Sequence, residues 1–243
     1  MGEAKRRQHT GAPSNKSVKE QRQQRLFWGI GITVVIAVIA LVLYLVTPGA
    51  GPTGQLPAAS GDRFPAELDQ YGVQRGDPDA PVVVREFADY QCPACASFAS
   101  QTHERLLEQY IDTGKVRLVF FEMPLRQHRN AIPAAMAARC AGDQGSYWDM
   151  QQTLFDRQSR WSNSNDPINV FTGYGEDLGL NTQRLERCLR NERRLEDVEA
   201  SLNVAQQLRV AATPTVLVDS TRLSVTNWEQ LSGVIERQLQ AGD

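Results

Sequence analysis

The fold is set by the stretch GDPDAPVVVREFADYQCPACASF, residues 76–98. Its centre, PVVVREF, is short and rich in β-branched residues, which predicts a strand over residues 81–87. A polar turn follows, and Cys92 and Cys95 then open a segment whose apolar residues have helical spacing. Pro93 suits the first turn of that helix, because its missing N–H would have no intrahelical partner there. The stretch therefore predicts a strand, a turn and a helix that begins at two cysteines.

Cysteines with this spacing have three common uses. A zinc site needs about four ligands, but Cys140 and Cys188 lie far apart and neither has a histidine beside it. A structural bridge across so short a loop would stabilise little. A redox pair gains directly from the predicted helix, whose N-terminus favours the thiolate that attacks disulfides. We therefore expect no metal, with Cys92 as the exposed nucleophile and Cys95 as the more buried resolving thiol.

The remaining pattern predicts an α/β domain. Further strands are expected over residues 116–123 and 214–219, with a possible fourth over 221–224. Residues 130–208 lack strand patterns and contain several helix-like stretches. The chain closes with an amphipathic helix, which Thr226 or Asn227 is expected to cap. A strand, helix and second strand in this order imply a parallel pair joined by a crossover helix.

Residues 26–46, LFWGIGITVVIAVIALVLYLV, contain no charged side chain. As a helix they would extend about 31 Å, which matches the hydrocarbon core of a bilayer. A buried core helix seldom has so long an uninterrupted apolar run. A cleaved signal peptide is the closer alternative, although its apolar region is usually shorter. Trp28 and Tyr44 lie near the two ends, as interfacial anchors do. We expect one transmembrane helix here.

The flanks of this segment predict its orientation. Residues 1–25 carry seven cationic side chains and two acidic ones, so this basic tail is expected to remain in the cytoplasm. A basic tail can also bind nucleic acid, but the adjoining span favours the membrane. Residues 47–65 are rich in Pro, Gly, Ala and Ser and indicate a flexible linker. Residues 66–243 then form the extracytoplasmic domain of a single-pass protein of the cell membrane.

Three segments in order resemble the DsbA-like thioredoxin family. They are the active-site stretch 76–98, the segment GDQGSYWDMQQTLFDRQ at 142–158 and the segment VAATPTVLVD at 210–219. The resemblance covers about residues 72–240. It implies a thioredoxin-like α/β fold with an inserted all-helical subdomain at about 128–208. With the N-terminal span, the expected protein is a membrane-anchored thiol–disulfide oxidoreductase.

The resemblance also assigns roles to single residues. Pro214 matches the family's cis-proline, and Thr213 the residue before it, whose backbone is thought to pair with substrate. Glu86 matches a buried carboxylate that assists proton transfer to the resolving thiol; a surface position on the strand is the alternative. Ala94 stands beside Pro93 inside the pair, where strongly oxidising members often have histidine. Asp89 is expected to be a turn or capping residue, His103 a solvent-facing residue without a role, and His128 a loop residue.

The remaining cysteines, Cys140 and Cys188, both fall in the predicted helical insertion. They could be two independent buried thiols. An oxidising compartment favours a structural disulfide that ties two helices together, and some members of the family have a second bridge. We therefore expect Cys140 and Cys188 to be paired.

The expected function is donation of disulfides to unfolded exported proteins through Cys92 and Cys95. It needs no cofactor beyond that pair, and we expect a monomer. A DsbB- or VKOR-like membrane enzyme would reoxidise the pair. Three alternatives remain: a reductase on the same scaffold, for example for cytochrome c maturation, an isomerase, and a non-catalytic chaperone-like binding module. An isomerase usually has a dimerisation domain, for which residues 47–71 are too short.

Overall fold

The computed structural model of the chain describes residues 63–242. The basic tail, the expected span at 26–46 and most of the linker lie outside this range. Within it, none of the helices combines the length and the apolar character that a membrane crossing requires. Apart from the last three residues of the expected linker, the described residues all belong to the domain that the sequence predicts over 66–243.

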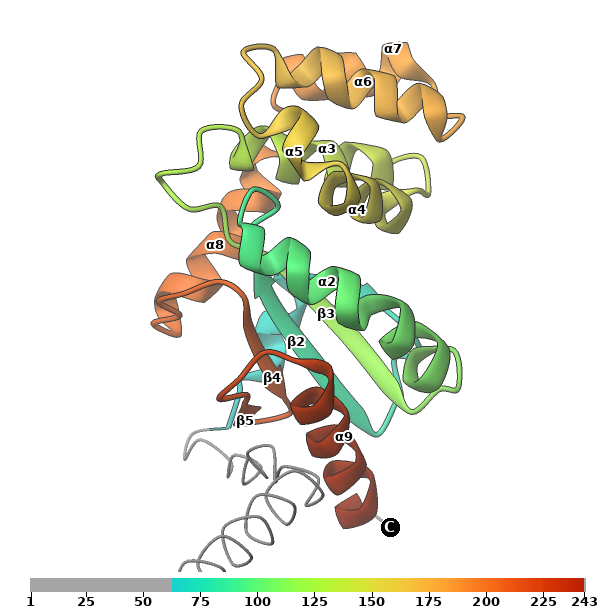
Figure 1. Cartoon of the computed structure of the whole chain (residues 1–243), viewed down its shortest axis with the longest axis vertical. Coiled ribbons are helices and arrows are strands. Elements are labelled where there is room, and N and C mark those ends of the chain that lie inside the picture. Colours follow the sequence, from blue (N-terminus) through green and yellow to red (C-terminus); the bar gives the residue numbers. More distant parts are fainter. Residues whose placement is uncertain (1–62, 243) are drawn as a thin grey trace, which may run out of the picture. The chain divides into compact units, whose positions relative to one another are not determined.

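Within residues 63–242, five strands form one mixed sheet in the order β1-β3-β2-β4-β5 (Figure 1). They are β1 (Val73–Arg75), β2 (Val82–Ala88), β3 (Val116–Glu122), β4 (Thr215–Val218) and β5 (Thr221–Arg222). β2 and β3 are parallel, as expected, and β1, β4 and β5 add antiparallel pairs. The sequence pattern missed β1, because three residues are too few to show an alternation.

The helices follow the predicted order. They are η1 (Ala66–Tyr71), α2 (Pro93–Leu106), η2 (Leu107–Ile111), α3 (Ala131–Gly142), α4 (Tyr147–Asp156), α5 (Gln158–Trp161), α6 (Pro167–Asp177), α7 (Thr182–Arg190), α8 (Leu195–Gln207) and α9 (Trp228–Gly242). Gly114, at a φ of 72°, follows the end of η2 in the left-handed region that suits glycine. Asn227 caps α9, because its Oδ1 accepts a 2.9 Å hydrogen bond from the N–H of Gln230.

The sheet is covered on both faces, and the alternation of β2 assigns its residues to them. Val82 and Val84 pack with apolar residues of α2 and α9, while Phe87 packs with apolar residues of α8 and of the segment at η1. Glu86 shares the register of Val82 and Val84, and it therefore lies on the α2 face.

The inserted helices α3 to α7 are stacked at one end of the molecule, above the first turn of α2 (Figure 1). They share a hydrophobic cluster with Cys92, Cys95 and Phe120. The helical insertion therefore packs directly against the cysteine pair as well as against the sheet.

Cys140 on α3 and Cys188 on α7 form a disulfide with an S–S distance of 2.00 Å and a Cα–Cα distance of 6.0 Å. Both cysteines are buried in the cluster of the insertion. The bridge joins positions 48 residues apart in the sequence. It ties the beginning of the insertion to a helix near its end, so that α4, α5 and α6 lie within the closed loop.

Replacing Cys140 and Cys188 together by alanine should lower the free energy of unfolding by about 4 kcal/mol, from the entropy of closing a loop of this length. Urea unfolding of the full chain would measure it. A matched variant with alanine at Cys92 and Cys95 keeps the bridge and should retain most of the stability. An equal loss in both double variants would contradict a specific contribution of the bridge.

Candidate active site

The cysteine pair lies where the turn after β2 enters α2. Cys92 is the N-cap residue of α2, with φ −77° and ψ 121°, and Pro93 is the first helical residue. Ala94 completes the short turn between the two thiols. Cys92 is 8% exposed and Cys95 is 0% exposed. The nucleophile is thus less exposed than the sequence suggested, but the expected order of the two thiols is correct.

Hydrogen bonds to its sulfur make Cys92 acidic. The thiol of Cys95 donates a hydrogen bond that lowers the pKa of Cys92 to about 5, although burial opposes the shift. Thr213 and the backbone N–H groups of Cys95 and Ala94 lower this pKa further. These N–H groups belong to the first turn of α2, where a helix leaves its donors unpaired. At neutral pH the reduced pair therefore carries a thiolate at Cys92.

Cys95 has the opposite character. Its hydrogen bond to Cys92 raises the pKa of Cys95 far above its ordinary value, and burial raises it further. One thiol is held as an anion and its neighbour is held protonated. This asymmetry is the one that thiol–disulfide exchange requires, because the attacking sulfur is ionised while the resolving sulfur keeps its proton until it is needed.

The loop that holds Thr213 and Pro214 faces this pair. The Thr213–Pro214 peptide bond is cis. The carbonyl oxygen of Thr213 lies 3.7 Å from the sulfur of Cys92, where it can accept a hydrogen bond when Cys92 is protonated as a thiol. The segment beside Pro214 therefore lies against the nucleophile, where the resemblance suggested that substrate would bind.

Gln158 of the insertion also reaches the active-site turn. Its Nε2 donates to the carbonyl oxygens of Tyr90, at 2.7 Å, and Cys92, at 3.0 Å. These bonds satisfy backbone acceptors next to the nucleophile. Gln158 lies 66 positions after Cys92 in the sequence, so no local pattern predicts this contact.

Asp89 holds the turn from inside. Its Oδ1 accepts from the N–H of Gln91 at 2.6 Å, and its Oδ2 accepts from the N–H of Leu125 at 2.8 Å. Asp89 Oδ2 also lies 2.8 Å from Nδ1 of His128. The expected turn role of Asp89 is correct, and His128, expected to be a loop residue without a further role, is in addition its hydrogen-bond partner.

Glu86 is buried, as one of the two interpretations required. Its side chain is 1% exposed, and its Oε2 lies 2.8 Å from Nε2 of His103 on α2. The expectation that His103 faces solvent was wrong, because its side chain is only 10% exposed. The large apolar residues of α2 predict a narrow buried stripe, whereas the smaller Ala99 and Thr102 are also buried. They extend the buried face of the helix towards His103.

The family model that matches this chain is described as thioredoxin and covers residues 69–237. The chain belongs to the thioredoxin family. It matches the probable disulfide bond formation protein D of Bacillus anthracis at 30% identity, over 72% of this chain and 82% of that protein. It matches disulfide bond formation protein D of Bacillus subtilis at 28% identity, over 68% of this chain and 76% of that protein.

The fold is shared with a solved structure, oxidised BdbD of Bacillus subtilis. The TM-score is 0.66 at 24% identity, over 76% of this chain and 99% of that one. Three rickettsial relatives, 25–26% identical, are longer, and this chain spans 64–71% of their length. The chain is a DsbA-like protein-disulfide oxidoreductase, with Cys92 and Cys95 as its CXXC pair.

Replacing Cys95 by alanine should raise the pKa of Cys92 above its value of about 5, because the strongest hydrogen bond to the thiolate is lost. The Cys95→Ser variant keeps a donor and should stay closer to the native value. The pH dependence of alkylation of Cys92 by iodoacetamide in the reduced full chain would measure both. The same pKa in the alanine variant and the native protein would contradict the assignment.

Proposed function

We propose that this chain is a dithiol oxidase that donates disulfides to exported proteins outside the cytoplasm. The observation that carries the proposal is the low pKa of Cys92, about 5. A stabilised thiolate stabilises the reduced pair, and the oxidised pair then becomes a better electron acceptor. The value lies between about 3.5 for DsbA and about 7 for thioredoxin. Ala94 supplies no positive charge, so we expect a weaker oxidant than DsbA.

The proposed reaction has two exchange steps. A substrate thiolate attacks Cys92 of the oxidised pair, the Cys92–Cys95 bond breaks, and Cys95 leaves and takes up a proton. A second substrate thiolate then attacks the substrate sulfur of the mixed disulfide, which releases the oxidised substrate and Cys92 as a thiolate. Two electrons pass from the substrate to the pair. In this proposal Glu86 exchanges the proton of Cys95, because Glu86 is buried and faces the helix that bears both cysteines.

The segment at Thr213 and Pro214 is the proposed binding site for substrate. Proline has no N–H, so the backbone there leaves room for a chain that adds as an extended strand. The carbonyl oxygen of Thr213 already contacts Cys92. An extended substrate bound along this segment would bring its cysteine to the nucleophile. Unfolded exported proteins, whose cysteines and backbone are accessible, are the proposed substrates.

We further propose that residues 26–46 anchor the protein in the cell membrane, with residues 1–25 in the cytoplasm. A DsbB- or VKOR-like membrane enzyme would then reoxidise the pair by taking its two electrons. The apolar segment and the basic residues before it support the anchor. The names of the two Bacillus relatives describe disulfide bond formation, which supports the oxidative direction.

The stability of the reduced protein should depend on pH in a defined direction. The pKa of Cys92 falls from about 8.5 in the unfolded chain to about 5 in the folded one. The thiolate therefore stabilises the reduced fold fully above about pH 8.5, and this contribution is lost as the pH falls through about 5. Between about pH 5 and pH 8, the melting temperature of the reduced chain should rise relative to that of the oxidised chain. A constant difference would contradict the thiolate assignment.

The reduction potential of the Cys92–Cys95 pair would test the direction of electron flow. The full chain would be equilibrated in glutathione buffers, and the fraction of reduced pair measured by alkylation. We expect a value nearer the −120 mV or so of DsbA than the −270 mV or so of thioredoxin. A value near that of thioredoxin would refute the oxidase and favour the reductase alternative.

A further inference from the structure

Glu86 is a buried carboxylate with one oxygen unused. Its Oε2 lies 2.8 Å from Nε2 of His103. Its Oε1 is buried and has no hydrogen-bond partner among the described residues. Buried polar atoms are nearly always paired, so one that is not asks for a functional explanation. A carboxylate oxygen left free in this way is available to accept or give a proton.

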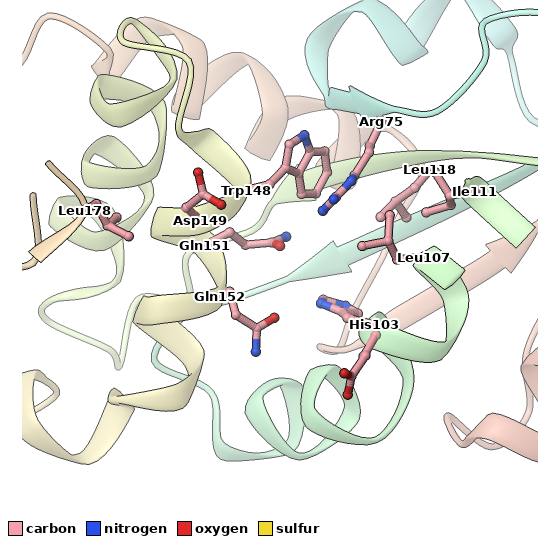
Figure 2. Close-up of a pocket in the computed structure, with 11 residues that line it drawn as sticks. Arg75, His103, Leu107, Ile111, Leu118, Trp148, Asp149, Gln151, Gln152 and Leu178 are labelled. Atoms are coloured by element: carbon pink, nitrogen blue, oxygen red, sulfur yellow. The ribbon is translucent and has the colours of Figure 1, made fainter. Parts of the chain in front are cut away.

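His103 separates this carboxylate from a cavity. The cavity has a volume of about 530 Å³, is partly open to solvent, and is lined by residues of β1, α2, α4 and neighbouring segments, His103 among them. Glu86 does not line it. Figure 2 shows the ring of His103 at the α2 side of the cavity, across from Gln151 and Gln152 of α4. The imidazole therefore has the buried carboxylate on one side and the cavity on the other.

The ring of His103 is held by its neighbours. Phe98 and Phe155 contact it edge to face, with ring centroids 6.2 Å and 6.1 Å away. Two apolar rings leave the imidazole little freedom to rotate, so Nε2 stays directed at Glu86. Nδ1, the other ring nitrogen, is the group left for exchange with the cavity.

The cavity suits water rather than a tightly bound apolar ligand. Besides His103, the cavity is lined by three charged residues, Arg75, Glu104 and Asp149. Gln151 also lines it, and the Nε2 of Gln151 is buried without a hydrogen-bond partner in the described part of the chain. A polar, roomy cavity with an unsatisfied donor is the kind of site that holds water.

Thiol–disulfide exchange in either direction needs a proton route. Cys95 must lose a proton when the pair becomes a disulfide and regain one when the disulfide opens. Its side chain has no exposure to solvent, so the proton cannot pass directly to bulk water. The route has to run through the interior of the domain.

We propose that His103 carries this proton between Glu86 and the water of the cavity. When the reduced pair is oxidised, the Cys95 thiol loses its proton to Glu86 as its sulfur attacks the Cys92 sulfur of a mixed disulfide, and the other thiolate leaves. With the ring proton of His103 on Nδ1, the free Nε2 accepts the proton from Glu86, and the ring then releases its Nδ1 proton to the water of the cavity. The inference rests on the role of Glu86 in the proposed function, but it holds for either direction of electron flow.

A two-phase assay separates the two thiols. The reduced full chain is mixed with a stoichiometric amount of dithiobis(nitrobenzoate), an aromatic disulfide whose thiolate product absorbs light. The first release of this product reports attack by Cys92, and the second reports attack by Cys95 on the mixed disulfide. The first phase is a control within each trace, because Cys92 is already ionised and needs no proton acceptor.

The His103→Gln variant keeps an amide that can hydrogen-bond to Glu86 in either direction but cannot carry a proton. We expect it to slow the second phase about tenfold near neutral pH and to leave the first unchanged, since proton transfer by a side chain contributes at least this much. Added imidazole, entering through the cavity, should restore the second phase of His103→Ala. Glu104→Gln, on the same helix and the same cavity, should match the native protein.

Other outcomes would refute the route through His103, the role of Glu86, or both. If Glu86→Gln slows the second phase and His103→Gln does not, Glu86 keeps its role and the route through His103 fails. If neither variant slows it, the role of Glu86 in the proposed function fails as well. If His103→Gln slows both phases equally, His103 serves only the fold, and the relay is refuted.

Discussion

A single hydrogen bond, from the thiol of Cys95 to the sulfur of Cys92, is the interaction on which the active site depends. It is the largest cause of the low pKa of Cys92 and of the raised pKa of Cys95. Two thiols three residues apart in most helices would titrate alike. Here the first lies at the N-cap, where unpaired N–H groups favour an anion, and the second lies one turn inside, away from solvent. The start of α2 and the burial of its first turn therefore act together to separate the pKa values of the two thiols.

The helical insertion makes that burial possible. A helix N-terminus at the edge of a sheet would ordinarily be open to water, which would weaken every electrostatic difference between the two sulfurs. Tyr90, two residues before Cys92, donates a 3.1 Å hydrogen bond to the hydroxyl oxygen of Tyr147 of α4, whose own proton goes to Glu122. Tyr147 donates in turn to Glu122 of β3 at 2.7 Å. This chain of contacts joins the turn, the insertion and the sheet, so the insertion supports the site as well as covering it.

The sequence predicted the parts of this structure that depend on neighbouring residues in the chain. The strand before Cys92, the helix after it and the cap at Asn227 follow from β-branched runs, apolar spacing and capping chemistry. The cis conformation of Pro214 needed the resemblance to a family, whereas the Cys140–Cys188 bridge followed mainly from the expected oxidising compartment. The contacts of Gln158 and His103 could not be read from the sequence, because each depends on which element packs opposite. The burial of Glu86 does follow from a local pattern, because alternation along the strand places it on the same face as Val82 and Val84.

The choice of partners for the buried acids separates structural from chemical roles. Among the described residues, four carboxylates are buried: Asp69, Glu86, Asp89 and Glu122. Asp69 pairs with Arg85 and Arg117, and Glu122 pairs with Arg139. Arginine does not give up its proton in proteins. These pairs therefore neutralise buried charge and fix the positions of the side chains, but they cannot pass on a proton.

Asp89 and Glu86 pair instead with histidines, whose two ring nitrogens can each bear or lack a proton. Both oxygens of Asp89 are also committed to backbone N–H groups, which fixes it as a support of the turn. Glu86 alone of the four combines a histidine partner with an oxygen that no described residue occupies. A carboxylate with a purely structural role would have both oxygens hydrogen-bonded, as Asp69, Asp89 and Glu122 do. The unfilled oxygen and the histidine partner together support the proposal that Glu86 takes up and releases a proton inside the domain.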